Sequence, residues 1–173
     1  MKPHEEHRHR APEHLKVRIV TVSTSRYASM QEGKKFTDEG GDLAESEAKK
    51  GGHSVTGRAL VSDDKKMIRL EMTKFLSGGD DVMIFTGGTG VAKRDVTVEA
   101  VRPYFEKELV GFGELFRRLS FEDVGFAGIL SRATAGIVKG KVVLCLPGSP
   151  AAVKLALGNF VGELPHLVFV ARS

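Results

Sequence analysis

The residues best suited to chemistry lie in the stretch Asp81–Thr97, which reads DVMIFTGGTGVAKRDVT. A short apolar run is followed by the glycine turn, residues 87–90, and a helical pattern begins just after Asp95. Glycines without Cβ atoms let backbone N–H groups point at an anion, and the start of a helix adds partial positive charge. The stretch therefore predicts a phosphate-binding turn made of Gly87, Gly88, Thr89 and Gly90.

The glycine turn does not match the common nucleotide-binding fingerprints. A Walker A loop would need Gly-Lys-Ser/Thr after four intervening residues, whereas Val91, Ala92 and Lys93 follow the turn here. The turn does not have the spacing of a GxGxxG motif either. A tight turn with a purely structural role therefore remains an alternative.

Two aspartates sharpen the phosphate interpretation. Asp95 stands shortly after Gly90, and an aspartate beside a phosphate repels it unless a cation lies between them. Mg²⁺ bound to phosphate oxygens would remove that repulsion. Asp63 stands between an expected strand and an expected helix. Either carboxylate could instead cap a helix N-terminus, and both interpretations stay open.

Composition indicates one globular domain and excludes several functional classes. The chain has 173 residues, a net charge of +4 and a single cysteine, Cys145, whose apolar neighbours favour a buried thiol. Basic residues are spread in ones and twos, which argues against a nucleic-acid-binding module. No apolar run reaches the roughly 18 residues of a membrane span, so we expect a cytoplasmic protein. Residues 1–14 are polar and histidine-rich, which predicts a mobile arm before a single domain at 15–173.

Alternating strand and helix patterns predict an α/β fold, a three-layer sandwich with a mostly parallel sheet between helices. A hairpin at 134–148 adds an antiparallel element, and Ser149-Pro150 is a helix-start signal. Residues 26–37 are expected to form a polar loop. Ligands of such sheets bind beyond the C-terminal strand ends, where the glycine turn and the LPGSP turn could line one crevice. The other expected strands lie at about 15–22, 54–61 and 82–86, and the expected helices at about 38–50, 64–77, 96–105, 111–132 (broken by Gly113, Gly125 and Gly128), 150–160 and 163–171.

Linked motifs along nearly the whole chain carry a family resemblance. TGGTG followed by RDVT, GFGELFR, LSRATAG and LPGSP, in this order and spacing, resembles the MoaB/MogA family of molybdenum cofactor biosynthesis, with the N-terminal tail closer to the MoaB branch. The resemblance implies a molybdopterin-binding fold and molybdopterin adenylyltransferase activity. In that reaction the terminal phosphate of molybdopterin attacks the α-phosphate of ATP, pyrophosphate leaves, and Mg²⁺ is the expected cofactor.

The resemblance also implies roles for individual residues. Asp63 and Asp95 match acidic positions that matter for catalysis and are expected to hold Mg²⁺, while the glycine turn matches the nucleotide-facing turn. VSDD lacks the family's proline, so Asp64 could stand in for Asp63. The charge of the reaction adds a role for Lys93 or Arg94, which could neutralise the leaving pyrophosphate, with plain solvated surface charges as the alternative. Matches on the pterin side are Ser120, Ser131 and Arg132, and matches in the turn that closes the pocket are Pro147, Gly148 and Ser149.

A second function stays open beside the enzyme. Some MoaB-branch members resemble non-catalytic paralogues that bind pterin, or a pathway partner, without turnover. The family resemblance further implies a trimer or hexamer, with residues 111–132 and the N-terminal arm as candidate contacts. It also implies a metal-insertion protein of the same pathway as a partner.

Overall fold

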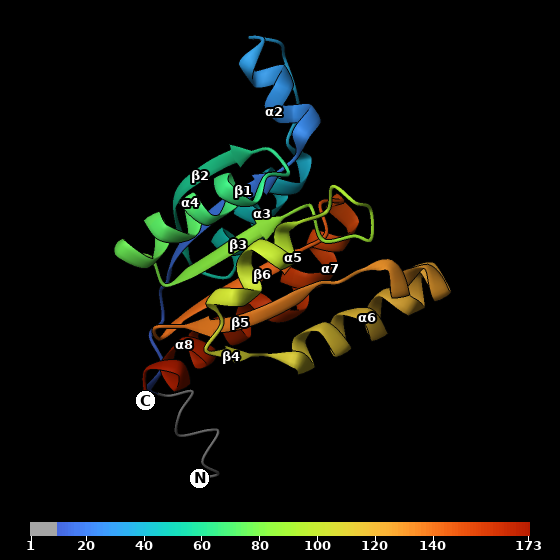
Figure 1. Ribbon diagram of the computed structural model, residues 1–173. Coiled ribbons are helices and arrows are strands. Elements are labelled where there is room, and N and C mark those ends of the chain that lie inside the picture. The colour runs from blue at the N-terminus through green and yellow to red at the C-terminus, as the bar shows by residue number, and fades with distance from the viewer. Residues whose placement is uncertain (1–9) are drawn as a thin grey trace.

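In the computed structural model of the protein, residues 10–173 are described, and the first nine residues of the arm expected at 1–14 lie outside the described part. Residues 10–14 contact the domain: His14 Nδ1 lies 2.7 Å from the Gly52 carbonyl oxygen, and Arg10 lies over the Phe169 ring. The fold is the expected α/β sandwich, with a six-stranded sheet between two helical layers (Figure 1).

The sheet has the order β2-β1-β3-β6-β5-β4. Neighbouring strands in the run β2, β1, β3 and β6 pair in parallel, whereas β5 is antiparallel to both β6 and β4. The carboxyl ends of β1, β3 and β6 therefore meet at one edge, as a parallel arrangement requires. The strands are β1 (Lys16–Val22), β2 (Ser54–Val61), β3 (Val82–Thr86), β4 (Lys107–Glu108), β5 (Thr134–Val138) and β6 (Lys141–Leu146).

Alternate residues of the central strands pack into two separate cores, one on each face of the sheet. In β3, Val82 and Ile84 pack with the helices α3, α6, α7 and α8, while Met83 and Phe85 pack with α4 and α5 on the other face. This two-sided burial explains why β3 reads as a continuous apolar run. The helices are α2 (Thr24–Gln31), α3 (Glu39–Lys50), α4 (Lys65–Ser77), α5 (Thr97–Val101), α6 (Val110–Val124), α7 (Pro150–Phe160) and α8 (Leu164–Arg172), with 3₁₀ turns η1 (Arg102–Tyr104), η2 (Gly125–Leu130) and η3 (Val161–Glu163).

Several local predictions are confirmed. The hairpin between β5 and β6 turns through Lys139 and Gly140, both with positive φ, of 50° and 69°. Ser149 caps α7, since its side chain accepts a hydrogen bond from the Ala152 N–H. Cys145 is fully buried, and that burial raises the pKa of its thiol, which fits a core residue rather than a nucleophile.

The polar loop expected at 26–37 is wrong in its first half, where α2 forms. The Ser23 side chain caps this helix by accepting from the Arg26 N–H, but no residue of α2 is buried. The helix projects from the edge of the sheet (Figure 1). Because it has no buried face, it lacks the apolar periodicity by which a helix is recognised in a sequence.

The breaks expected in the helix 111–132 are only partly right. Helix α6 runs unbroken through Gly113, whose missing side chain lets the helix approach the Ala133 carbonyl oxygen. It ends at Gly125, which has a positive φ of 61°, and η2 continues through Gly128. The short strand β4 was not predicted, because two residues carry no alternation.

The helical residues Pro150–Arg172 are long and apolar enough, by composition, to cross a membrane. The same residues form part of the core in this fold. Val153, Ala156 and Leu157 in α7, with Leu164 and Val168 in α8, are completely buried against the sheet. Their apolar character is therefore explained by packing.

Candidate active site

The glycine turn lies at the carboxyl end of β3, between the ends of β1 and β6. The Gly87 N–H donates to the Leu146 carbonyl, and Thr97 fixes the turn from the other side. The Thr97 hydroxyl donates to the Gly87 carbonyl at 2.8 Å and its N–H to the Gly88 carbonyl at 3.0 Å. Gly88 has a positive φ of 67°, and a Cβ there would overlap the Thr97 hydroxyl. The turn is thus a cradle held by hydrogen bonds on both sides, with no side chain at Gly87, Gly88 or Gly90.

The neighbouring aspartates after β2, Asp63 and Asp64, have different hydrogen-bond partners. Asp64 caps α4, because its Oδ1 accepts from the N–H groups of Lys66 at 2.8 Å and Met67 at 3.0 Å. Asp63 instead accepts at Oδ2 from both the N–H and the hydroxyl of Thr24, at 2.9 and 2.7 Å. Its Oδ1 faces the glycine turn, 3.0 Å from the position of a Cβ on Gly88. The helix-capping interpretation of Asp63 is therefore wrong.

Asp95 approaches the glycine turn from the opposite end. Its Oδ2 accepts from the Ala92 N–H at 2.9 Å and lies 2.8 Å from the position of a Cβ on Gly90. The N-cap residue of α5 is Val96, which makes no side-chain capping bond, so the capping interpretation is wrong for Asp95 as well. Asp63 therefore faces the cradle with Oδ1, which accepts no hydrogen bond within residues 10–173, whereas Asp95 faces it with Oδ2, the oxygen that accepts from the Ala92 N–H.

This donor set fits Mg²⁺ better than a metal held by protein alone. The described residues contain no group of three or more His, Cys, Asp or Glu side chains that could hold a metal ion. Mg²⁺ is usually held by one or two carboxylates together with substrate phosphates and water. Asp63 and Asp95, on either side of a turn suited to phosphates, match that pattern.

Arg132 reaches the glycine turn rather than the pocket predicted for the pterin. Its Nε donates to the Gly90 carbonyl at 2.9 Å and its Nη2 to the Asp95 carbonyl at 3.2 Å. The guanidinium also pairs with Glu99. This hydrogen-bonded pair lowers the pKa of Glu99 and raises the pKa of Arg132. We call this arrangement the Arg132 clamp.

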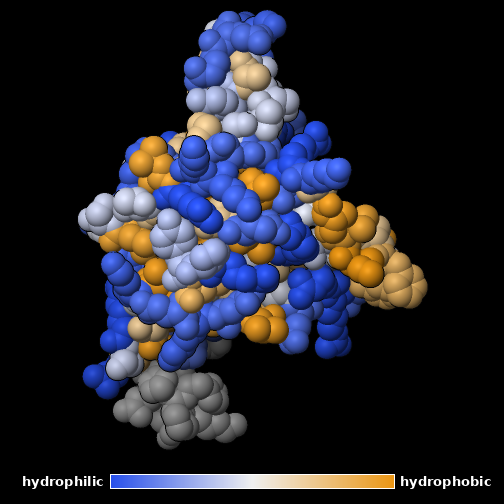
Figure 2. Space-filling view, in the orientation of Figure 1, coloured by the Kyte–Doolittle hydropathy of each residue, from blue (hydrophilic) through white to orange (hydrophobic). Residues whose placement is uncertain are grey.

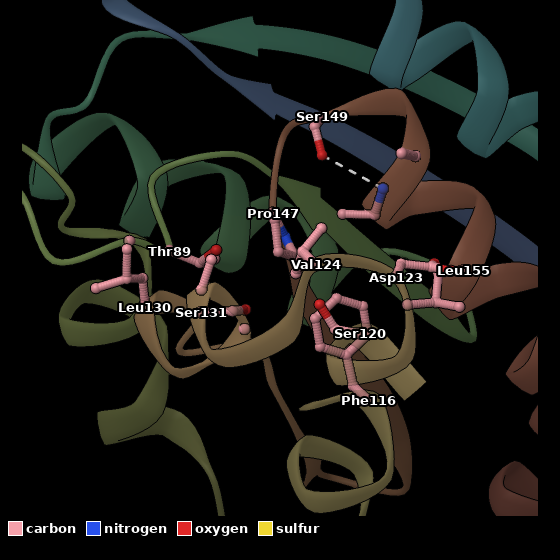
Figure 3. A pocket seen from close by; sticks show the side chains of 15 residues that line it. Thr89, Phe116, Ser120, Asp123, Val124, Leu130, Ser131, Pro147, Ser149 and Leu155 are labelled. Atoms are coloured by element: carbon pink, nitrogen blue, oxygen red, sulfur yellow. Dashed lines mark hydrogen bonds between the residues drawn. The ribbon is translucent and has the colours of Figure 1, made fainter. Parts of the chain in front are cut away.

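A pocket of about 320 Å³ opens beside the glycine turn (Figure 3). The α6 residues that line it, Phe116, Ser120, Asp123 and Val124, share one face of that helix at spacings of three and four. Sequence reasoning missed Asp123, although its position three residues after Ser120 on a helix was a usable signal. Predicted residues that line the pocket are Thr89, Gly90, Ser120, Ser131, Pro147 and Ser149.

The remaining predicted residues lie outside the pocket lining. Gly148 packs behind it, where a Cβ would lie 3.2 Å from the Gly87 Cα. Arg132 lines a neighbouring pocket of about 560 Å³ together with Arg102 and Arg117. Lys93 and Arg94 are exposed next to the turn and make no hydrogen bond or ion pair within residues 10–173.

Comparison with known proteins identifies a matching family and several similar proteins. Residues 18–166 match a family model described as "Probable molybdopterin binding domain". The chain is 42% identical to the molybdenum cofactor biosynthesis protein B of Bacillus cereus, over 95% of each chain. It is 41% identical to the molybdopterin adenylyltransferase of Pyrococcus furiosus, over 98% of each chain. Its structure is similar to that of the tungsten cofactor synthesizing protein MoaB from Pyrococcus furiosus, with a TM-score of 0.83 and 40% identity over 94% of this chain and 100% of that one.

Proposed function

We propose that this chain, which belongs to the MoaB/MogA family of molybdopterin-binding proteins, is a molybdopterin adenylyltransferase. The terminal phosphate of molybdopterin would attack the α-phosphorus of ATP, forming one P–O bond while the bond to the β-phosphate bridging oxygen breaks. Pyrophosphate and adenylylated molybdopterin are the products. The observation that carries this proposal is the pair Asp63 and Asp95, which flank a glycine cradle beside a pocket of heterocycle size.

Nucleotidyl transfer asks a protein chiefly to align two polyanions and to compensate their charge. The N–H groups of Gly88, Thr89 and Gly90 would bind phosphate oxygens of ATP, since that of Gly87 already donates to the Leu146 carbonyl. The exposed cations Lys93 and Arg94 would neutralise charge on the departing pyrophosphate. The Arg132 clamp would hold the turn in place through the Gly90 and Asp95 carbonyls. Alignment of the phosphates is therefore supplied mainly by backbone groups that are fixed before substrates bind.

Asp63 and Asp95 would hold Mg²⁺ next to the cradle, and the ion supplies charge compensation for the phosphates when it is bound. Thr24 fixes one oxygen of Asp63, so the other oxygen is the one presented to the ion. Asp95 instead turns Oδ2 toward the cradle, and this same oxygen accepts from the Ala92 N–H. Each carboxylate would therefore contribute a single oxygen.

The pocket beside the turn would receive the pterin. Its walls include the apolar side chains of Phe116, Val124, Leu130 and Leu155, which suit a flat heterocycle. Ser120 and Ser131 contribute hydroxyl groups, and the Pro147–Ser149 turn closes one side. In this arrangement the phosphate of molybdopterin would point from the pocket toward Gly90 and the nucleotide.

The wider setting follows the family. We expect a cytoplasmic enzyme that assembles as a trimer or hexamer and hands its product to a metal-insertion protein. A non-catalytic paralogue that binds pterin without turnover is the second candidate. The carboxylate oxygens that Asp63 and Asp95 turn toward the cradle favour the enzyme, since pterin binding alone gives these two side chains no role.

The test is turnover by the purified chain with molybdopterin, ATP and Mg²⁺, measured as pyrophosphate and adenylylated molybdopterin. Asp95→Asn should lower turnover by at least about 100-fold, the scale of losing one preorganised charge at a reacting group. Its amide oxygen can still accept from the Ala92 N–H, so thermal unfolding should stay unchanged. Asp42→Asn, on the exposed start of α3, is the control and should keep full activity.

Two outcomes would contradict the proposal. A fully active Asp95→Asn variant would remove Asp95 from the metal role. Wild-type protein that binds pterin tightly yet releases no pyrophosphate would establish the non-catalytic candidate.

A further inference from the structure

The proposed pterin pocket contains one charged side chain. Of the 15 residues that line it, only Asp123 is ionisable, and the other lining side chains are apolar or hydroxyl-bearing. Asp123 is an exposed residue of the pocket lining, and within residues 10–173 it makes no hydrogen bond or ion pair, so the fold gives it no structural role. A carboxylate beside apolar walls is stabilised by ligand N–H donors that it can accept from.

Two hydroxyls beside Asp123 are also without partners. The Ser120 hydroxyl lies three residues earlier on the same face of α6 and makes no hydrogen bond within the described residues. Thr89 is 2% exposed, lines the same pocket, and its hydroxyl has no hydrogen-bond partner there either. Figure 3 places the three side chains around one hollow. A ligand with its own polar edge would give all three groups a partner inside an otherwise apolar pocket.

The chemistry of a carboxylate selects among heterocycles. The aminopyrimidinone edge of a pterin carries two adjacent donors, the ring N3–H and the 2-amino group, and a carboxylate accepts both in a bidentate pair. The adenine edge instead places a ring nitrogen acceptor next to its amino donor, which would set a lone pair against a carboxylate oxygen. The Asp123 carboxylate therefore favours a pterin over an adenine as the ligand of this pocket.

We propose that Asp123 is the specificity-determining residue of this pocket and binds the N3–H and 2-amino edge of the pterin. The inference rests on the proposed function only in taking pterin as the ligand of the pocket. It assigns a role to α6, since Asp123 and Ser120 come from one helical face. It also places the adenine of ATP outside the pocket, on the side of the glycine turn.

The test compares two small probes, 6-hydroxymethylpterin and its lumazine analogue, in which a carbonyl oxygen replaces the 2-amino group. Binding is followed by ligand fluorescence, without ATP or metal. Wild-type protein should bind the pterin about 10- to 100-fold more tightly, because a charge-assisted hydrogen bond is exchanged for a repulsive contact. In Asp123→Asn the preference should shrink to within about 3-fold, because the amide offers only one acceptor.

Glu122→Gln is the matched control. Glu122 neighbours Asp123 on α6 and carries the same charge, but it lines a different surface hollow with Leu115 and Arg118. This variant should keep the wild-type preference. If it loses the preference as Asp123→Asn does, the effect is one of general charge, and the proposal is overturned.

The remaining outcomes separate this inference from the adenylyltransferase activity. Wild-type protein that binds both probes equally, or an Asp123→Asn variant that keeps the full preference, overturns the role of Asp123 even if the enzyme turns over. Loss of the preference in Asp123→Asn supports the role even if no pyrophosphate is ever released.

Discussion

At the scale of single residues, Asp63 and Asp64 show how adjacent identical side chains acquire different roles. The Asp64 carboxylate accepts hydrogen bonds from N–H groups at the start of α4. Asp63 points the other way, and Thr24 holds one of its oxygens with two hydrogen bonds. Thr24 also begins α2, so the helix without a buried face is tied to the candidate metal ligand. The orientation of Asp63 therefore depends on a hydroxyl from another segment.

Alanine substitutions should separate the two aspartates. Asp64→Ala removes a helix cap and should cost about 1 kcal/mol of unfolding free energy while turnover is kept. Asp63→Ala should abolish turnover with a smaller effect on stability, because its hydrogen bonds to Thr24 are exposed. Denaturant unfolding and pyrophosphate release measure the two effects. The reverse pattern would show that Asp64 is the functional carboxylate.

Two substitutions of Thr24 test whether its hydroxyl positions Asp63. Thr24→Val keeps the shape but removes the hydroxyl that orients Asp63, so turnover should fall about 10-fold at unchanged thermal stability. Thr24→Ser restores the hydroxyl and should recover most of the activity. Binding of Mn²⁺ in the presence of ATP, followed by electron paramagnetic resonance, should weaken in the valine variant alone. Equal metal binding by both variants would mean that Thr24 does not position Asp63.

At the scale of elements, the Arg132 clamp joins the segment between η2 and β5 to the glycine turn and α5. Ser131 lines the proposed pterin pocket, while the next residue, Arg132, binds carbonyls of the turn. Its ion pair with Glu99 is partly exposed, so its contribution to stability is on the order of 1 kcal/mol or less. The clamp therefore matters more for the position of Asp95 than for holding the fold.

Arg132→Lys should lower kcat about 10-fold or more, because an ammonium group cannot reach two carbonyls and Glu99 together as the planar guanidinium does. The affinity for 6-hydroxymethylpterin should change less than about 3-fold, since Arg132 lies outside the pocket lining. Arg102→Lys, which disturbs the pair with Glu108 in the neighbouring pocket, is the control and should keep kcat. A parallel loss of pterin affinity in Arg132→Lys would instead mean that Arg132 contacts the pterin.

At the scale of the whole molecule, apolar side chains gather on the end of α6 and on η2, where Figure 2 shows a hydrophobic patch at one side of the molecule. Phe126 is 83% exposed and stacks edge-on against Phe121, with ring centroids 5.3 Å apart. A contiguous apolar patch of this kind marks an interaction surface. Val124 and Leu130 belong both to the patch and to the pocket lining, so a copy bound there would cover one side of the pocket.

We expect light scattering to give a mass of three or six chains for the wild-type protein. Phe126→Ser combined with Ile129→Ser should lower that mass, because the two most exposed apolar residues of the patch would become polar. Leu70→Ser is the control, since Leu70 is exposed on α4, on the other face of the sheet. An unchanged mass for the double variant would show that subunits associate through another surface.

Much of the fold was readable from local pattern. The alternation along β1, the continuous apolar run of β3, the cap and proline at the start of α7, and the Lys139-Gly140 turn all depend on neighbouring residues, and each predicts its element where it occurs. The two elements that the sequence did not predict share one cause. Helix α2 has no buried face and β4 has only two residues, so neither carries a periodic signal.

The sequence by itself determined the α/β class, the glycine turn and the order of elements, because these follow from residue type, spacing and family motifs. Only the tertiary structure decided which aspartate faces the turn, where Arg132 points, and that Asp123 enters the pocket. The first two of these depend on contacts between segments far apart in the chain, 39 residues for Thr24 with Asp63 and 42 for Arg132 with Gly90. Local periodicity carries no information on such pairs, since the packing of helices on both faces of the sheet brings them together.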